Sequence, residues 1–242
     1  MEKTLCLDFG NTRLKAALFN NDTFVEEWVM PDATVATIQQ IVQLYQPTKS
    51  ILSSVILHPP EIEELLKKTT RFHKLGHTSK LPLTTPVGKP ETIGADRLAM
   101  VAASVNLFPN QHNLAIGLGS CITYNFINNM SEFLGGSISP GMTMRFRSMN
   151  EFTALLPMIQ PEHHFPLVGY DTKTNLLSGV ILGMAKEIDG IIDAYKLKYS
   201  NFNVLLTGGD MPFFVPHLKN RIFADPNLIY KGLYAISEYN NK

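Results

Sequence analysis

Asp8, Asn11, Thr12 and Lys15 stand at the bend of "TLCLDFGNTRLKAALF", between two short apolar runs. A bend of this type, with Gly10 beside Asn11, presents backbone N–H groups in a concave array that can hold phosphate oxygens. A carboxylate at the end of a strand can hold Mg²⁺, directly or through water. An ordinary hairpin turn also favours Gly and Asn, so this bend alone leaves both interpretations open.

Two further glycine-rich segments occur later in the chain. "GLGSC" at 117–121 lies between apolar runs and adds the hydroxyl of Ser120, and "TGGD" at 207–210 ends an apolar run. A dinucleotide fingerprint is excluded because Ile122 occupies its third glycine position, and no GxxxxGK[ST] loop is present. Each segment alone is a weak signal, but the three together favour nucleotide binding.

The hydrophobic pattern places these bends between strands. In the first half it predicts strands at 4–9, 14–19, 22–30 and 49–57, and helices at 35–45, at 59–70 and from near Gly94, after a loop at 81–90. In the second half it predicts strands on both sides of "GLGSC", a strand at 132–141, a helix from Met142, a loop at 160–168, a helix at 173–197 and a strand into "TGGD".

A unit of strand, bend, strand and strand therefore occurs twice, beginning near residues 4 and 113. The repeat lies in the pattern and not in residue identity. We expect two α/β domains, residues 1–111 and 112–242, with a ligand cleft between two similar halves.

Bulk composition excludes several other classes of protein. The 242 residues are 45% apolar and 17% charged, as in a globular protein, and Lys+Arg equals Asp+Glu at 21 each. No global charge therefore attracts nucleic acid or an anionic membrane. Cys6 and Cys121 lie in apolar runs, which indicates buried thiols and a reducing compartment. No apolar run approaches the roughly 18–20 residues that span a bilayer. We expect a cytoplasmic protein without nucleic-acid or membrane partners.

Six segments have an order and spacing that resemble a known family. They are "DFGNTRLKAALF" at 8–19, "SSV" at 53–55, "GADR" at 94–97, "GGSISPGMTMRFRSMNEFTALLP" at 135–157, "DTKTNLLSG" at 171–179 and "TGGD" at 207–210. Together they resemble type III pantothenate kinases, members of the acetate and sugar kinase/heat-shock protein/actin superfamily, over nearly the whole chain. The resemblance implies two ribonuclease-H-like (actin-like ATPase) domains, with a duplicated mixed sheet flanked by helices. It also implies transfer of the ATP γ-phosphate to pantothenate, the first step of coenzyme A biosynthesis.

The resemblance also implies roles for individual residues. The ATP-phosphate loop corresponds to Asp8, Phe9, Gly10, Asn11, Thr12, Arg13, Leu14 and Lys15, with Ser120 from the second loop, and the substrate site corresponds to Gly94, Ala95, Asp96, Arg97 and Thr172. Asp8 would hold Mg²⁺ through water, and Asp96 would be the catalytic base that accepts the proton of the pantothenate hydroxyl. Locally, Asp96 and Arg97 can also be read as charges of a first helical turn, and Thr172 as a helix N-cap.

The second loop departs from the family pattern Asp-x-Gly-Thr-Ala-x-Thr-x-Asp. Gly117 and Asn125 stand at the two acidic positions, while Ser120 and Thr123 keep hydroxyls. The family implies a monovalent cation, K⁺ or NH₄⁺, bound by the first acid, and glycine has no side-chain oxygen for it. Val87 stands where the family tends to have Tyr. The family further implies a homodimer.

Two alternatives to pantothenate kinase remain at the level of sequence. One is a superfamily kinase that phosphorylates another hydroxyl acceptor. The other is a non-catalytic, nucleotide-binding regulatory protein, suggested by the missing acids of the second loop.

Overall fold

The computed structural model describes residues 2–241, which form two compact units. Unit 1 contains the chain up to Asn110, Ile127–Gly135 and the chain from Asn227 onward. Unit 2 contains Gln111–Phe126 and Gly136–Pro226. These units do not coincide with the expected domains 1–111 and 112–242. Unit 1 also contains Ile127–Gly135, and the last helix packs with the first sheet.

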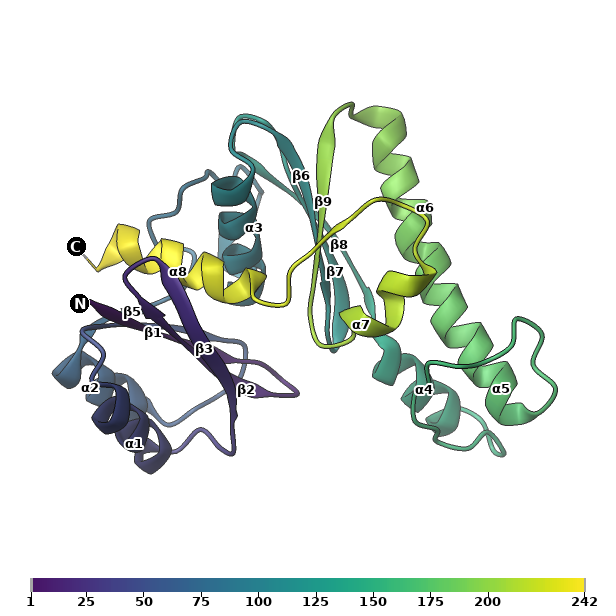
Figure 1. Ribbon diagram of the computed structural model, residues 1–242, viewed down its shortest axis with the longest axis horizontal. Coiled ribbons are helices and arrows are strands. Elements are labelled where there is room, and N and C mark those ends of the chain that lie inside the picture. Colours follow the sequence, from purple (N-terminus) through teal and green to yellow (C-terminus); the bar gives the residue numbers. More distant parts are fainter. Residues whose placement is uncertain (1, 242) are drawn as a thin grey trace. The chain divides into compact units, whose positions relative to one another are not determined.

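Two five-stranded sheets repeat one topology (Figure 1). The first has the order β3-β2-β1-β4-β5, with β1 Lys3–Phe9, β2 Leu14–Asn20, β3 Thr23–Met30, β4 Lys49–Ser54 and β5 Arg71–Lys74. The second, read from its far edge, has the order β8-β7-β6-β9-β10, with β6 His112–Leu118, β7 Cys121–Ile127, β8 Phe133–Pro140, β9 Phe202–Thr207 and β10 Phe223–Ala224. The predicted duplication and the duplicated mixed-sheet fold are therefore confirmed; the short strands β5 and β10 were not predicted.

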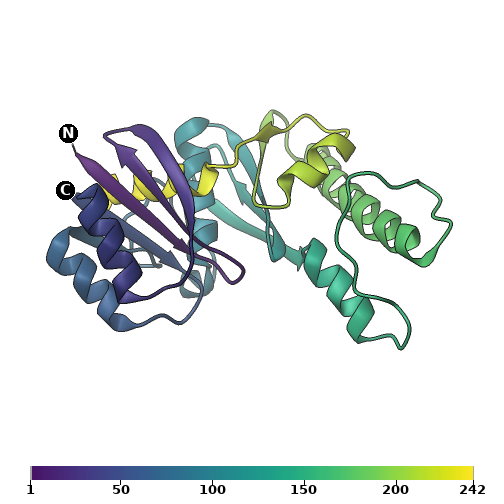
Figure 2. The same cartoon turned by 60° about the horizontal axis from the view of Figure 1, so that its bottom comes forward.

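Helices cover both faces of the first sheet (Figures 1 and 2). The helices α1 (Val35–Tyr45) and α2 (Pro60–Thr69) pack on one face, and α3 (Ala95–Leu107) and α8 (Leu228–Asn240) on the other. Side chains of β1 alternate accordingly: Leu5, Leu7 and Phe9 join the α1–α2 core, whereas Cys6 joins the α3–α8 core. Because a strand has a period of two residues, Asp8 belongs to the α3–α8 face.

In unit 2, α4, α5 and α6 pack against Leu114, Ile116 and Leu118 of β6. Their bounds are α4 Met142–Glu151, α5 Thr172–Leu177 and α6 Gly183–Lys198, followed after β9 by α7 Met211–Phe214. The predicted long helix near 173–197 is present, but its middle, Ser178–Leu182, is a π-helical turn. Two 3₁₀ turns, Pro90–Thr92 and Val215–His217, complete the helical elements of the described chain.

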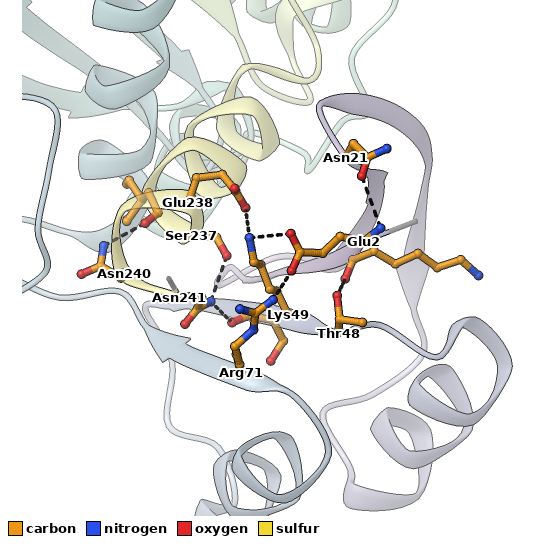
Figure 3. Close-up of polar contacts among 12 residues, drawn as sticks. Glu2, Asn21, Thr48, Lys49, Arg71, Ser237, Glu238, Asn240 and Asn241 are labelled. Atoms are coloured by element: carbon orange, nitrogen blue, oxygen red, sulfur yellow. Dashed lines mark hydrogen bonds and ion pairs between the residues drawn. The ribbon is translucent and has the colours of Figure 1, made fainter.

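A buried lysine ties the N-terminal strand region to the last helix (Figure 3). Lys49, at the start of β4, is 5% exposed and pairs with Glu2 at 2.9 Å and Glu238 of α8 at 2.8 Å. Asn241 donates to Ser50 O at 3.1 Å. Lys49 pairs with Thr4 in the parallel register, four positions before the pair of Ser53 with Asp8, so this network lies at the other end of the strands from Asp8.

Across the described residues, no helix has both the length and the apolar character needed to cross a membrane.

Candidate active site

The first bend joins β1 to β2 at residues 10–13. It closes through a hydrogen bond from Gly10 N to Arg13 O at 3.1 Å, and Asn11, Thr12 and Arg13 are exposed. Phe9 is fully buried, and Leu14 packs partly buried against the same core. Of the residues predicted here, Phe9 and Leu14 therefore anchor the bend, while the exposed polar residues can meet a ligand.

Asp8 lies at the carboxyl end of β1, partly exposed, directly opposite Lys15 of β2. Ser53 of β4 donates its Oγ proton to Asp8 Oδ1 at 3.2 Å. Burial, and then the carboxylate of Asp96, raise the pKa of Asp8 to about 6, against the opposing effects of Ser53 and Lys15. A cation near Asp8 would therefore stabilise its ionised form.

Asp96 is the second residue of α3, whose N-cap is Gly94. Its pKa is raised, because burial outweighs the hydrogen bond from Arg97 N–H and the guanidinium charge of Arg97. Arg97 in turn lies over the ring of Phe133, 5.6 Å from the ring centre. Ala95 is 8% exposed and packs in the α3–α8 core.

The structure thus brings Asp8 and Asp96 into electrostatic contact on one face of the first sheet. Tyr230 of α8, which is 2% exposed, lies in the same environment: burial, then Glu27 and the charge of Asp8, raise its pKa. Two interacting carboxylates with raised pKa values are suited to a cation and to proton transfer. Among residues 2–241, however, no three His, Cys, Asp or Glu side chains form a metal-binding group.

The second bend, between β6 and β7, is enclosed by backbone. Gly119 N donates to Cys121 O at 3.1 Å, and Gly141 N donates to Ser120 O at 3.1 Å. A Cβ on Gly141 would lie 2.2 Å from Gly119 O. Gly208, with φ +108, would place a Cβ 2.1 Å from Leu118 O. Only glycine permits both approaches, and they leave Gly119 and Ser120 exposed.

The position equivalent to Asp8 in the second sheet is Gly117. Asp8 pairs with Ser53 in the parallel register of the first sheet, and Gly117 pairs with Thr207 in that of the second. Thr207 Oγ1 is buried and has no hydrogen-bond partner among the described residues. Asn125, at the second acidic position, donates to Ala115 O at 3.1 Å and so joins β7 to β6.

Thr172 is the exposed first residue of α5, in unit 2. The N-cap is Asp171, which accepts a hydrogen bond from Thr174 N at 2.7 Å, so the helix does not use Thr172 as its cap. Ser120 also belongs to unit 2, whereas Asp8, Lys15, Asp96 and Arg97 belong to unit 1.

The sequence alone indicates no role for Ser53, although the "SSV" segment contains it. The parallel pairing of β1 with β4 is the signal that could have found it, since this pairing places Ser53 beside Asp8. The place of Thr207 beside Gly117 likewise depends on the parallel pairing of β6 with β9.

Comparisons with known proteins agree on a family and a fold. A sequence model described as type III pantothenate kinase matches residues 4–194. The chain is similar to a type III pantothenate kinase of Christiangramia forsetii, with 39% identity over 98% of each chain. A Bacteroides fragilis protein of the same name is 38% identical, again over 98% of each chain. Among solved structures, a putative Baf family transcriptional activator from Campylobacter jejuni matches with a TM-score of 0.59 and 22% identity over 98% of each chain. At that identity the last likeness concerns the fold alone.

Proposed function

The chain belongs to the type III pantothenate kinase family, and we infer from this membership that it transfers the γ-phosphoryl group of ATP to pantothenate. The product is 4'-phosphopantothenate, and the reaction is the first step of coenzyme A biosynthesis. The observation that best supports this function is the pair Asp8 and Asp96, whose carboxylates interact beside the first bend.

We propose that Asp96 is the catalytic base. It would accept the proton of the primary hydroxyl as that oxygen bonds to the γ-phosphorus and the bond to the bridging oxygen of ADP breaks. The raised pKa of Asp96 favours this role, since a base works best when its pKa approaches the working pH. Gly94 and Arg97 beside Asp96, and the exposed Thr172 of unit 2, would contact the acceptor.

The first bend would bind the ATP phosphates. Its Gly10–Arg13 turn, the exposed Asn11 and Thr12 and the cation of Lys15 provide N–H, hydroxyl and positive groups for phosphate oxygens. Mg²⁺, when bound, neutralises phosphate charge, and Asp8 is the residue that would hold it, through water. Ser120 would add a hydroxyl from the second bend.

The monovalent cation of the family does not fit the second bend. Gly117 supplies no side-chain oxygen at the position where the family has its cation-binding Asp. We therefore assign no K⁺ or NH₄⁺ ligand to this chain and expect turnover without such a cation.

A homodimer is the proposed assembly, and unit 2 offers a surface for it. Phe152 and Leu155, which follow α4, are 81% and 91% exposed. Further exposed apolar residues lie nearby in sequence: Ile138, Met144, Met158, Leu167, Val168 and Tyr170. A second copy of the chain would remove this surface from water. Sedimentation should show a dimer, and the double variant Phe152→Ser, Leu155→Ser should be a monomer.

The family and the two free cysteines also favour a cytoplasmic location.

The decisive experiment is a phosphorylation assay with MgATP and pantothenate, with and without K⁺ or NH₄⁺. Wild type should form phosphopantothenate, and Asp96→Asn should lower kcat by about a thousandfold, as expected for loss of a general base. Glu91→Gln, which removes an exposed acid five residues earlier, is the matched control. ATP binding without product under every cation condition would instead favour a regulatory protein. Coupled ADP release with another alcohol would favour a different acceptor.

A further inference from the structure

The connection between β4 and α2, residues 55–59, is attached to the end of β1. Ser53, just before it, donates to Asp8 Oδ1 at 3.2 Å, and Val55 N donates to Phe9 O at 3.0 Å. Phe9 is the last residue before the first bend. A shift of the connection would therefore reach Phe9, which lies between Asp8 and the first bend.

His58 holds the connection from within. Its side chain is 6% exposed, and Nε2 lies 3.1 Å from Glu63 Oε1. Because an ionised carboxylate can only accept, Nε2 carries a proton and donates it to Glu63. Nδ1 lies 3.1 Å from the Oγ of Ser54, whose single proton can go either to Nδ1 or to Ile56 O, 2.9 Å away. The imidazole thus joins the end of β4 to the first turns of α2.

Glu63 is itself held in its ionised form. Lys74 of β5 donates to Glu63 Oε1 at 2.7 Å. Burial opposes the charge of Glu63, but hydrogen bonds from Lys74 and His58 outweigh it, and the pKa of Glu63 lies below its usual value. His58 therefore has a fixed, charged acceptor on one side.

The same imidazole packs against the residue before the bend. The rings of His58 and Phe9 lie edge to face, with centres 5.5 Å apart and planes at 86°. Phe9 is fully buried and cannot move away without opening the α1–α2 core. His58 thus contacts Phe9 through its ring and fixes the connection whose Val55 N–H donates to Phe9 O.

We propose that His58 is a positioning residue for the kinase reaction. Fixed by Glu63 and Ser54, it acts through Phe9 and the 55–59 connection to hold the Asp8 carboxylate and the N–H groups of the first bend where ATP phosphates bind. The proposal rests on the proposed function for the identity of the ligand. It concerns the nucleotide side of the reaction, so the two substrates should respond differently to its loss.

The test compares His58→Ala with His58→Gln. His58→Ala should raise the KM for MgATP about tenfold, the lower range for a residue that orients a ligand-binding group. The KM for pantothenate should change less than about twofold. His58→Gln keeps an N–H donor at the distance of Nε2 and should recover MgATP binding to within about threefold of wild type.

Two matched controls separate positioning from general loss of stability. His73→Ala removes another partly buried imidazole of the same unit. His73 lies on β5, and its Nε2 is 2.7 Å from Ser79 Oγ. Lys67→Ala removes the exposed partner of Glu63, 3.9 Å away, and leaves His58 in place. Both controls should keep the KM for MgATP within about twofold of wild type.

Calorimetry with ATP and Mg²⁺, in the absence of pantothenate, measures the ATP affinity of the first bend independently of turnover. Wild-type ATP affinity in His58→Ala, or an equal loss in His73→Ala, would overturn the proposal. If wild type binds ATP but makes no phosphopantothenate, the proposed function fails. Weaker ATP binding in His58→Ala than in His73→Ala would still support the positioning role. If His58→Ala does not fold, His58→Gln against His73→Ala decides the question by the same measurements.

Discussion

The two glycine-rich bends occupy equivalent places in two sheets of the same topology, yet they are built differently. The bend after β1 is flanked by charge, with Asp8 and Lys15 facing each other across the strands. The bend after β6 carries no charged residue and is enclosed by Gly141 and Gly208. The first bend therefore has charged side chains beside it, whereas the second presents backbone and the hydroxyl of Ser120.

The residues behind the two bends show the same difference. Ser53 donates to Asp8, whereas Thr207, its register equivalent, faces Gly117 and has a hydroxyl without a partner in the described chain. The second sheet thus retains the hydroxyl but not the carboxylate that such a hydroxyl satisfies in the first. The two sheets therefore share a strand order, whereas the charged groups lie beside only one of the two bends.

The largest effect expected from this comparison is on catalysis. Asp8→Asn keeps the shape of the first bend but removes its negative charge, and we expect kcat/KM for MgATP to fall about a thousandfold, the upper range for loss of one electrostatic contact at a reacting group. Steady-state kinetics with varied Mg²⁺ would measure it. Asp22→Asn, at the exposed turn between β2 and β3, should leave kcat/KM for MgATP unchanged. Wild-type activity in Asp8→Asn would remove the functional distinction between the bends.

At the second bend, we expect a substitution to affect the stability of the protein more than its catalysis. Gly141→Ala places a methyl group 2.2 Å from Gly119 O and 2.6 Å from Ser120 O, so backbone must move. We expect a loss of about 3 kcal/mol in the free energy of unfolding, as for overpacking of a buried site. Urea titration with an unchanged m-value would measure it.

Gly10→Ala is the control for that experiment. Its methyl group would lie 3.1 Å from Arg13 O at an exposed bend, so a small shift of the bend can accommodate it. The cost should stay within about 1 kcal/mol. Equal costs at Gly10 and Gly141 would show that backbone enclosure does not distinguish the second bend from the first.

Much of this arrangement could be predicted from the sequence, because its signals are local. Alternating apolar residues and Gly–Asn turns indicate strand–bend–strand units, and the same order recurs near residue 113. The start of α3 after Gly94 and of α4 after Gly141 also follows from short-range patterns. These signals were sufficient to place Asp8 and Asp96 at the ends of elements.

Other features depend on pairing between distant segments and could not be predicted in this way. The contact of Ser53 with Asp8 comes from the parallel register of β1 and β4, which no local pattern encodes. The four-residue strand β5 is too short for a clear alternation. The packing of α8 with the first sheet, which places Tyr230 near Asp8, joins the two ends of the chain.

The raised pKa of Asp8 predicts a pH dependence of stability that the second bend lacks. The pKa is about 6 in the folded state, above the usual 3.8, so the folded protein binds more protons between these values. The free energy of unfolding should therefore fall as pH rises from about 4 to above 6, by about 1–2 kcal/mol after allowance for partial exposure. Asp8→Asn should remove this decrease, measured by urea titrations across that range. A difference between variant and wild type that does not change with pH would contradict the assignment.

The smallest predicted effects have opposite signs, and they test the register equivalence directly. Ser53→Ala removes the donor to Asp8 Oδ1, which should raise the pKa of Asp8 further and lower the free energy of unfolding by about 1 kcal/mol at neutral pH. Thr207→Val replaces the unpartnered buried hydroxyl with a methyl group of similar size. Because no hydrogen bond within the described chain is lost, the free energy of unfolding should rise by about 0.5–1 kcal/mol. Paired urea titrations distinguish the two signs. A destabilising Thr207→Val would show that this hydroxyl is satisfied in solution, and that the second sheet keeps a polar contact equivalent to that between Ser53 and Asp8.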